Sequence, residues 1–245
     1  MGDMQRVQQI CDEFERLCQI PFNDRLRDYK DAGGKIVGIL YNQVAEELIL
    51  AAGLLPVRLR AVGSKGDELA DARFTQVNCS EVRCLYDAAA RGTFDFIDGL
   101  VATNACDHIR KLYENWADVL KPPYAHLVCF PKRKGDDLQV AHLAGELANF
   151  KSSLEEHFGV QITDDALRAA ISLANEIRAL QLKLDNVRAA SANPPITGTQ
   201  ALAVHMVGTC MPRQDYKALL SELVDACEGV EGQPGQKRLV VYGGE

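Results

Sequence analysis

Short apolar segments alternate with segments of helical periodicity between residues 35 and 130, and this alternation constrains the fold more than any other feature of the sequence. Four apolar segments have the length and composition of buried strands: 35–40, 56–62, 96–102 and 124–130. Apolar residues recur at helical spacing in three intervening segments: 44–52, 81–91 and 109–116. Strands that alternate with helices at this pitch form parallel, right-handed βαβ units. We therefore predict an α/β fold with a parallel, Rossmann-like sheet flanked by helices and followed by a mainly helical segment.

The rest of the sequence is mostly helical in pattern. An apolar stripe predicts an N-terminal helix over residues 4–18. Helical patterns without intervening strands follow the predicted sheet: 138–157, 164–190, 200–207 and 214–227. A linker then leads to an apolar segment at 238–242, which we expect to be the first strand of a missing second lobe; the alternative is a last strand of the first sheet. The predicted parts are an N-terminal helical segment, a Rossmann-like lobe, a helical segment, and a linker with a strand: 1–32, 33–135, 136–231 and 232–245.

The charge balance and the hydropathy argue against two classes of partner. The formal net charge is −7, with 27 Lys and Arg against 34 Asp and Glu. Binding to a nucleic-acid backbone needs clustered basic side chains, whereas the only dense basic run is 132–134. The longest apolar run, 48–57, is too short to cross a bilayer. We therefore expect a cytoplasmic protein that binds neither nucleic acid nor membrane.

Two of the eight cysteines, Cys79 and Cys106, are predicted at the starts of helices. Unpaired N–H groups at a helix start favour a thiolate, and the carboxyl ends of parallel strands meet at one edge of a sheet. Such a junction suits a metal-binding sulfur, and we expect the two cysteines to lie close together. Cys11, Cys18 and Cys129 are predicted to be buried in packing. Cysteine spacing alone does not establish a cluster, and on this evidence buried thiols are the favoured interpretation.

The motifs of nucleotide-binding loops and of common hydrolases do not occur in the sequence. Any ATP is therefore expected to be handled by a partner. The histidines are dispersed, and for each of them a structural or surface role is the favoured interpretation: His108, His126, His142, His157 and His205.

Three segments, in this order, resemble the 2-hydroxyacyl-CoA dehydratase and benzoyl-CoA reductase family: 44–57 (VAEELILAAGLLPV), 79–83 (CSEVR) and 98–107 (DGLVATNACD). The resemblance implies an iron–sulfur subunit in which Cys79 and Cys106 bind a [4Fe-4S] cluster. It also implies three partners: a sister subunit of the same family, an ATP-dependent activator iron–sulfur protein, and an acyl-CoA substrate. The implied reaction is the one-electron reduction of the CoA thioester, as in a dehydratase or a benzoyl-CoA reductase of this type.

The same resemblance implies a catalytic role for Glu47, which matches the family's Glu before Leu-Ile. Glu47 would shape the substrate pocket or transfer a proton; the alternative is a solvated carboxylate at a helix start. Ala45 stands where the family usually has Pro. The family's third cluster cysteine lies in a second lobe, and neither Cys210 nor Cys227 sits in a matching motif. A second hypothesis is therefore a truncated, catalytically incomplete assembly module that pairs with a full-length sister subunit. A third is a relative with a double-cubane cluster that reduces small molecules.

Overall fold

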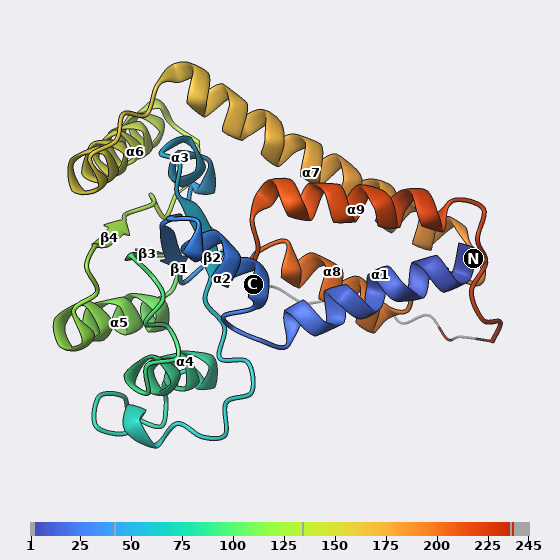
Figure 1. Ribbon diagram of the computed structural model, residues 1–245. Coiled ribbons are helices and arrows are strands. Elements are labelled where there is room, and N and C mark those ends of the chain that lie inside the picture. The colour runs from blue at the N-terminus through green and yellow to red at the C-terminus, as the bar shows by residue number, and fades with distance from the viewer. Residues whose placement is uncertain (1–2, 42, 134, 236, 238–245) are drawn as a thin grey trace.

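A four-stranded parallel sheet forms the centre of one half of the molecule, in the order β2-β1-β3-β4 (Figure 1). The structure is a computed structural model and describes residues 3–41, 43–133, 135–235 and 237. Its strands are β1 (Ile36–Ile39), β2 (Leu55–Arg58), β3 (Gly99–Thr103) and β4 (Ala125–Val128). In the register, Val37 lies opposite Pro56 on one side and Gly99 on the other, and Leu100 lies opposite Ala125. The predicted parallel α/β fold is confirmed.

Helices cover both faces of the sheet. On one face lie α3 (Glu46–Ala51) and α6 (Asp137–Phe158), and on the other lie α4 (Ser80–Ala90) and α5 (Asp107–Asn115), which continues into the π-helical turn Trp116–Leu120 (Figure 1). The alternation of β1 explains this division, because Ile36 packs in one buried cluster and Val37 in the other. The central strands are thus apolar on both faces, as expected for a covered parallel sheet.

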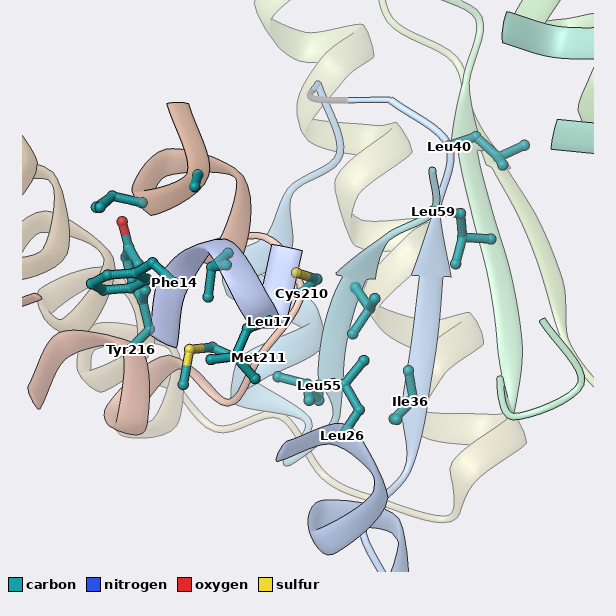
Figure 2. Packing of buried hydrophobic residues seen from close by; sticks show 14 of the residues in the cluster. Phe14, Leu17, Leu26, Ile36, Leu40, Leu55, Leu59, Cys210, Met211 and Tyr216 are labelled. Carbon is teal, nitrogen blue, oxygen red and sulfur yellow. The ribbon is translucent and has the colours of Figure 1, made fainter. Parts of the chain in front are cut away.

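The second half of the molecule is a bundle of α1 (Asp3–Cys18), α7 (Asp164–Ala190), α8 (Gly198–Val207) and α9 (Arg213–Cys227). α1 packs against α8 and α9, from the other end of the sequence. Figure 2 shows Phe14 of α1 beside Tyr216 of α9, with Met211 lying between them and the sheet residue Leu55. One buried cluster therefore runs from the bundle into the sheet. The division of the chain at residues 32, 135 and 231 stays a prediction.

An N-cap residue and two glycines lie at the helix ends where the sequence predicts them. Thr163 caps α7, its hydroxyl accepting a hydrogen bond from the backbone N–H of Ala166 at 3.2 Å. Gly53 and Gly92 follow α3 and α4 with φ of +75° and +83°, a conformation that favours glycine.

Several predicted bounds need correction. The fourth strand ends at Val128 and not at residue 130. The third strand begins at Gly99 and not at residue 96, because residues 94–97 form a turn in which Phe94 packs against Trp116. The second strand ends at Arg58 and not at residue 62. The expected helix at 44–52 is confined to Glu46–Ala51. The structure also contains two short helices that the sequence did not predict, α2 (Asp24–Asp31) and the 3₁₀ helix Glu68–Ala70. The expected strand at 238–242 lies outside the described residues.

Asp98 connects α2 to the start of the sheet. Its carboxylate accepts hydrogen bonds from Lys30 Nζ at 2.7 Å, from the backbone N–H of Ile36 at 2.8 Å and from Lys35 Nζ at 3.3 Å. Burial raises the pKa of Asp98, but these donors outweigh it, so that its pKa lies below the ordinary value.

Two Glu–Arg pairs connect α3 to the helical bundle. Arg213, which is only 7% exposed, donates to Glu46 Oε2 at 2.6 Å and to the carbonyl oxygen of Pro56 at 3.1 Å. Arg178, on the surface of α7, donates to Glu47 Oε1 at 2.6 Å. Arg213 thus joins α9, α3 and β2 at a buried point, whereas the Arg178 pair is more open to solvent.

Among the residues that the structure describes, no helix combines the length and the apolar character needed to cross a bilayer.

Replacing Asp98 should change the pH dependence of stability. Because the folded pKa is depressed, the stabilisation is present above the unfolded pKa and is lost as the pH falls through the folded pKa. We expect Asp98→Asn to cost about 1–2 kcal/mol at pH 7 and progressively less below about pH 4. Urea unfolding of the variant and the wild type, between pH 7 and below about pH 4, tests this prediction. The control is Asp95→Asn, which changes an exposed carboxylate. A penalty independent of pH would contradict the assignment.

Replacing Arg213 should cost more than replacing Arg178. Arg213→Ala leaves the Glu46 carboxylate and the Pro56 carbonyl without their donor, and we expect a loss of about 2–4 kcal/mol. Arg178→Ala breaks a solvent-screened pair and should cost about 0–1 kcal/mol. Urea unfolding at pH 7 compares the two variants, and equal losses would show that Arg213 is not the buried connection described above.

Candidate functional site

The strand order places a topological switch point between β1 and β3. The chain leaves β1 for β2 on one side and later returns to β3 on the other, passing through helices on opposite faces. In open α/β sheets, ligands bind outside the carboxyl ends of the strands at such a point. Glu47 lies just beyond the carboxyl end of β1, in α3, and Cys106 lies just beyond that of β3. Two of the three predicted site residues therefore follow the two strands that flank the switch point.

Cys106 is the N-cap residue of α5, in extended conformation. Asn104 holds the loop before it against the end of β4: its Oδ1 accepts from the backbone N–H of Phe130 at 2.8 Å, and its Nδ2 donates to the Phe130 carbonyl at 3.1 Å. Lys132 also donates to the carbonyl of Ala105 at 3.2 Å. The half-buried Cys106 therefore lies in a loop that is tied to the neighbouring strand.

Cys79 is the N-cap residue of α4 and is exposed. The loop before it is anchored by Arg83, one turn into the helix, whose buried guanidinium donates to Asp67 at 2.6 Å, to Asp71 at 2.5 Å and to the carbonyl of Phe74 at 3.3 Å. Arg83 is the last residue of the segment 79–83, which carries part of the family resemblance. A residue of this motif therefore helps to fix the position of Cys79.

The two cysteine junctions lie side by side. α4 and α5 pack against each other, and the backbone N–H of Cys79 lies 3.4 Å from Nδ1 of His108, two residues after Cys106. Neither cysteine side chain caps a backbone N–H of its own helix. First-turn N–H groups therefore remain available to stabilise an anionic sulfur. The contact at His108 places the two helix starts next to each other, while the proximity of the two sulfurs and metal binding by Cys79 and Cys106 stay predictions.

Glu47 contributes to a pocket of about 240 Å³ between α3 and the bundle. Leu50, Leu173 and Ile177 supply apolar lining, and the Glu47–Arg178 and Glu46–Arg213 pairs supply polar lining. Since α3 covers the face opposite α4 and α5, Glu47 meets α7 and not the helices that begin at the cysteines. Its observed partner favours an ion pair between the two halves of the molecule, and its catalytic role stays a prediction.

The remaining cysteines only partly follow the expectation of burial. Cys11 is fully buried, and burial raises the pKa of its thiol to about 12. Cys18 and Cys129, which were also expected to be buried, are half-buried, and this prediction was wrong. Cys18 lies at the end of α1, where its sulfur accepts from Arg60 at 3.6 Å. Cys129 follows the last residue of β4, which is an edge strand of the described sheet.

Among residues 3–41, 43–133, 135–235 and 237, no three His, Cys, Asp or Glu side chains come together as metal ligands. If Cys79 and Cys106 bind a cluster, they would supply two of its thiolates, and other groups would have to complete the donor set.

Sequence reasoning missed two residues that contact the predicted ones. The sequence favours only a structural or surface role for His108, although its place two residues after Cys106 puts it in the first turn of α5. Arg178 gives no signal in the sequence, since 131 residues separate it from Glu47.

Comparison with known proteins places the chain in a family. The family model described as 2-hydroxyglutaryl-CoA dehydratase, D-component, matches residues 41–245. A benzoyl-CoA reductase subunit of Thauera aromatica is 28% identical over 89% of this chain and 57% of its own length. The (R)-phenyllactyl-CoA dehydratase beta subunit of Clostridium sporogenes is 25% identical over 98% of this chain and 64% of its own length.

A third relative, the putative dehydratase subunit YjiM of Escherichia coli (strain K12), is 31% identical over 87% of this chain and 55% of its own length. The chain thus spans between 55% and 64% of the length of the curated relatives that it matches. Because the family match covers residues 41–245, well over half of the chain, the chain belongs to the 2-hydroxyglutaryl-CoA dehydratase D-component family.

Proposed function

We propose that this chain is the iron–sulfur subunit of an ATP-activator-dependent enzyme of the 2-hydroxyacyl-CoA dehydratase or benzoyl-CoA reductase type. Cys79 and Cys106 would supply two thiolate ligands to a [4Fe-4S] cluster. The bound cluster would deliver single electrons for the reduction of a CoA thioester. A sister subunit of the same family and an ATP-dependent activator would be its partners in the cytoplasm. The names of the relatives, which are subunits of CoA-ester dehydratases and of a benzoyl-CoA reductase, support this assignment.

The placement of the two cysteines carries the proposal. Both are N-cap residues of neighbouring helices on one face of a parallel sheet, and the contact at 3.4 Å between Cys79 N and His108 Nδ1 holds the two helix starts together. Thiolates are the usual ligands of iron–sulfur clusters, and a helix start lowers the free energy of the thiolate form. The alternative explanation of buried, inert thiols fits Cys11 but does not fit the exposed Cys79.

The chain's own residues would orient these ligands. Asn104 and Lys132 hold the loop of Cys106, and Arg83 holds the loop of Cys79. The pocket at Glu47 has a mixed lining, in which Leu50, Leu173 and Ile177 are apolar and the Glu47–Arg178 and Glu46–Arg213 pairs are charged. Its apolar side chains would contact the apolar part of a small acyl group.

Anaerobic reconstitution with iron and sulfide tests the cluster. We expect the full chain, or the chain together with its sister subunit, to develop the broad visible absorption of a [4Fe-4S] protein. Cys79→Ala and Cys106→Ala should each lower bound iron by about tenfold or more, because each variant removes one of only two thiolates that this chain is proposed to supply.

The matched control for reconstitution is Cys84→Ala, which removes a half-buried thiol from the same helix, α4. This variant should retain the iron content of the wild type. Iron uptake that persists in the double variant lacking Cys79 and Cys106 would contradict the proposal.

A second candidate function is a catalytically incomplete assembly module that pairs with a full-length sister subunit. One observation favours it: within residues 3–41, 43–133, 135–235 and 237, no three potential metal-ligating side chains come together. Titration of the chain against an iron-loaded sister subunit distinguishes the two functions. A stable complex without additional iron would support the assembly module, and additional iron that depends on Cys79 would support the iron–sulfur subunit.

A further inference from the structure

His108 connects the two helix starts through a single ring nitrogen. Its Nδ1 lies 3.4 Å from the backbone nitrogen of Cys79 and 3.2 Å from Oδ1 of Asn78. A flip of the Asn78 amide would lose hydrogen bonds, because its Nδ2 donates to the hydroxyl of Thr75 at 3.1 Å and to the Thr75 carbonyl at 3.3 Å. The amide oxygen of Asn78 is therefore the group that faces the imidazole.

Nδ1 of His108 cannot accept a hydrogen bond from the Cys79 N–H and donate one to Asn78 Oδ1 at the same time. When Nδ1 carries a proton, it donates to Asn78 Oδ1; when it carries none, it accepts from the Cys79 N–H. Either tautomer leaves one hydrogen bond between α5 and the segment Asn78–Cys79. The connection to the segment persists in either tautomer, but only the tautomer without a proton on Nδ1 bonds Cys79 itself, and it is this tautomer that fixes Cys79.

We propose that His108 is a positioning residue that holds Cys79 at a fixed place relative to Cys106. Cys106 is already fixed by the contacts of Asn104 with Phe130, and Arg83 anchors the loop before Cys79 from the other side. The contact of His108 is the link that runs directly from the first turn of α5 to the residue that starts α4. The consequence for cluster binding rests on the proposed function, whereas the connection itself does not.

A pair of amide variants tests the role of this nitrogen. In His108→Asn, the amide oxygen or nitrogen occupies the place of Nδ1, so that the bond to Asn78 or Cys79 is preserved. In His108→Gln, the amide extends to the place of Nε2, so that a group of similar polarity is present and the bond is lost. The two variants differ in the position of one polar group and therefore separate positioning from general polarity.

Hydrogen exchange of the Cys79 amide is the first readout. We expect exchange in His108→Gln to be roughly 2- to 10-fold faster than in the wild type, the factor expected from one lost hydrogen bond, and near the wild-type rate in His108→Asn. Unchanged exchange in β3 shows that the fold is intact. Wild-type exchange of Cys79 in His108→Gln, or equal acceleration in both variants, would overturn the inference.

The rate of iron transfer from the reconstituted protein to a chelator is the second readout. We expect His108→Gln to lose iron faster than the wild type, and His108→Asn to behave like the wild type. Iron loss at one common rate in all three proteins, despite faster amide exchange in His108→Gln, would overturn the part of the inference that concerns the cluster. If the wild type takes up no iron, the proposed function fails, and the exchange experiment alone decides whether His108 holds Cys79.

Discussion

The parallel pairing of β1 and β3 is the constraint on which the arrangement of the site depends. Parallel strands direct all their carboxyl ends to one edge of the sheet, and each following helix begins there. Cys106 follows β3 after a short loop, and Cys79 starts the helix that packs beside the one after Cys106. Residues that are far apart in the sequence are therefore brought together by the backbone pairing before any side-chain contact is considered.

The helical bundle is joined to this sheet by apolar packing and by a buried charge. One cluster of buried residues extends from Phe14 and Tyr216 in the bundle to Leu55 in the sheet (Figure 2). At its margin, Arg213 binds both Glu46 and the carbonyl of Pro56. Since a buried guanidinium is costly without partners, this pairing fixes how α9 meets α3 and β2. The pocket at Glu47 exists because the two halves meet in this way.

Most of the fold could be predicted from the sequence because periodicity and capping are local properties. The strand–helix alternation, the cap at Thr163 and the stops at Gly53 and Gly92 each depend on a few neighbouring residues. The start of β3 was misplaced because Phe94 and Phe96 resemble strand residues but pack their rings against Trp116 and Phe22 instead. The helix α2 was missed because its sequence is highly polar, and its stability depends on tertiary contacts such as Lys30 with Asp98.

The candidate site was only partly accessible from sequence. Cys79 and Cys106 could be found by motif and by their place at helix starts, but the bond from His108 crosses 29 residues and has no local signature. The most direct test of the account is the anomalous diffraction of iron in crystals of the anaerobically reconstituted protein. The account predicts iron density in contact with the sulfurs of both Cys79 and Cys106. Iron bound at one of these sulfurs alone, or elsewhere in the molecule, would contradict it.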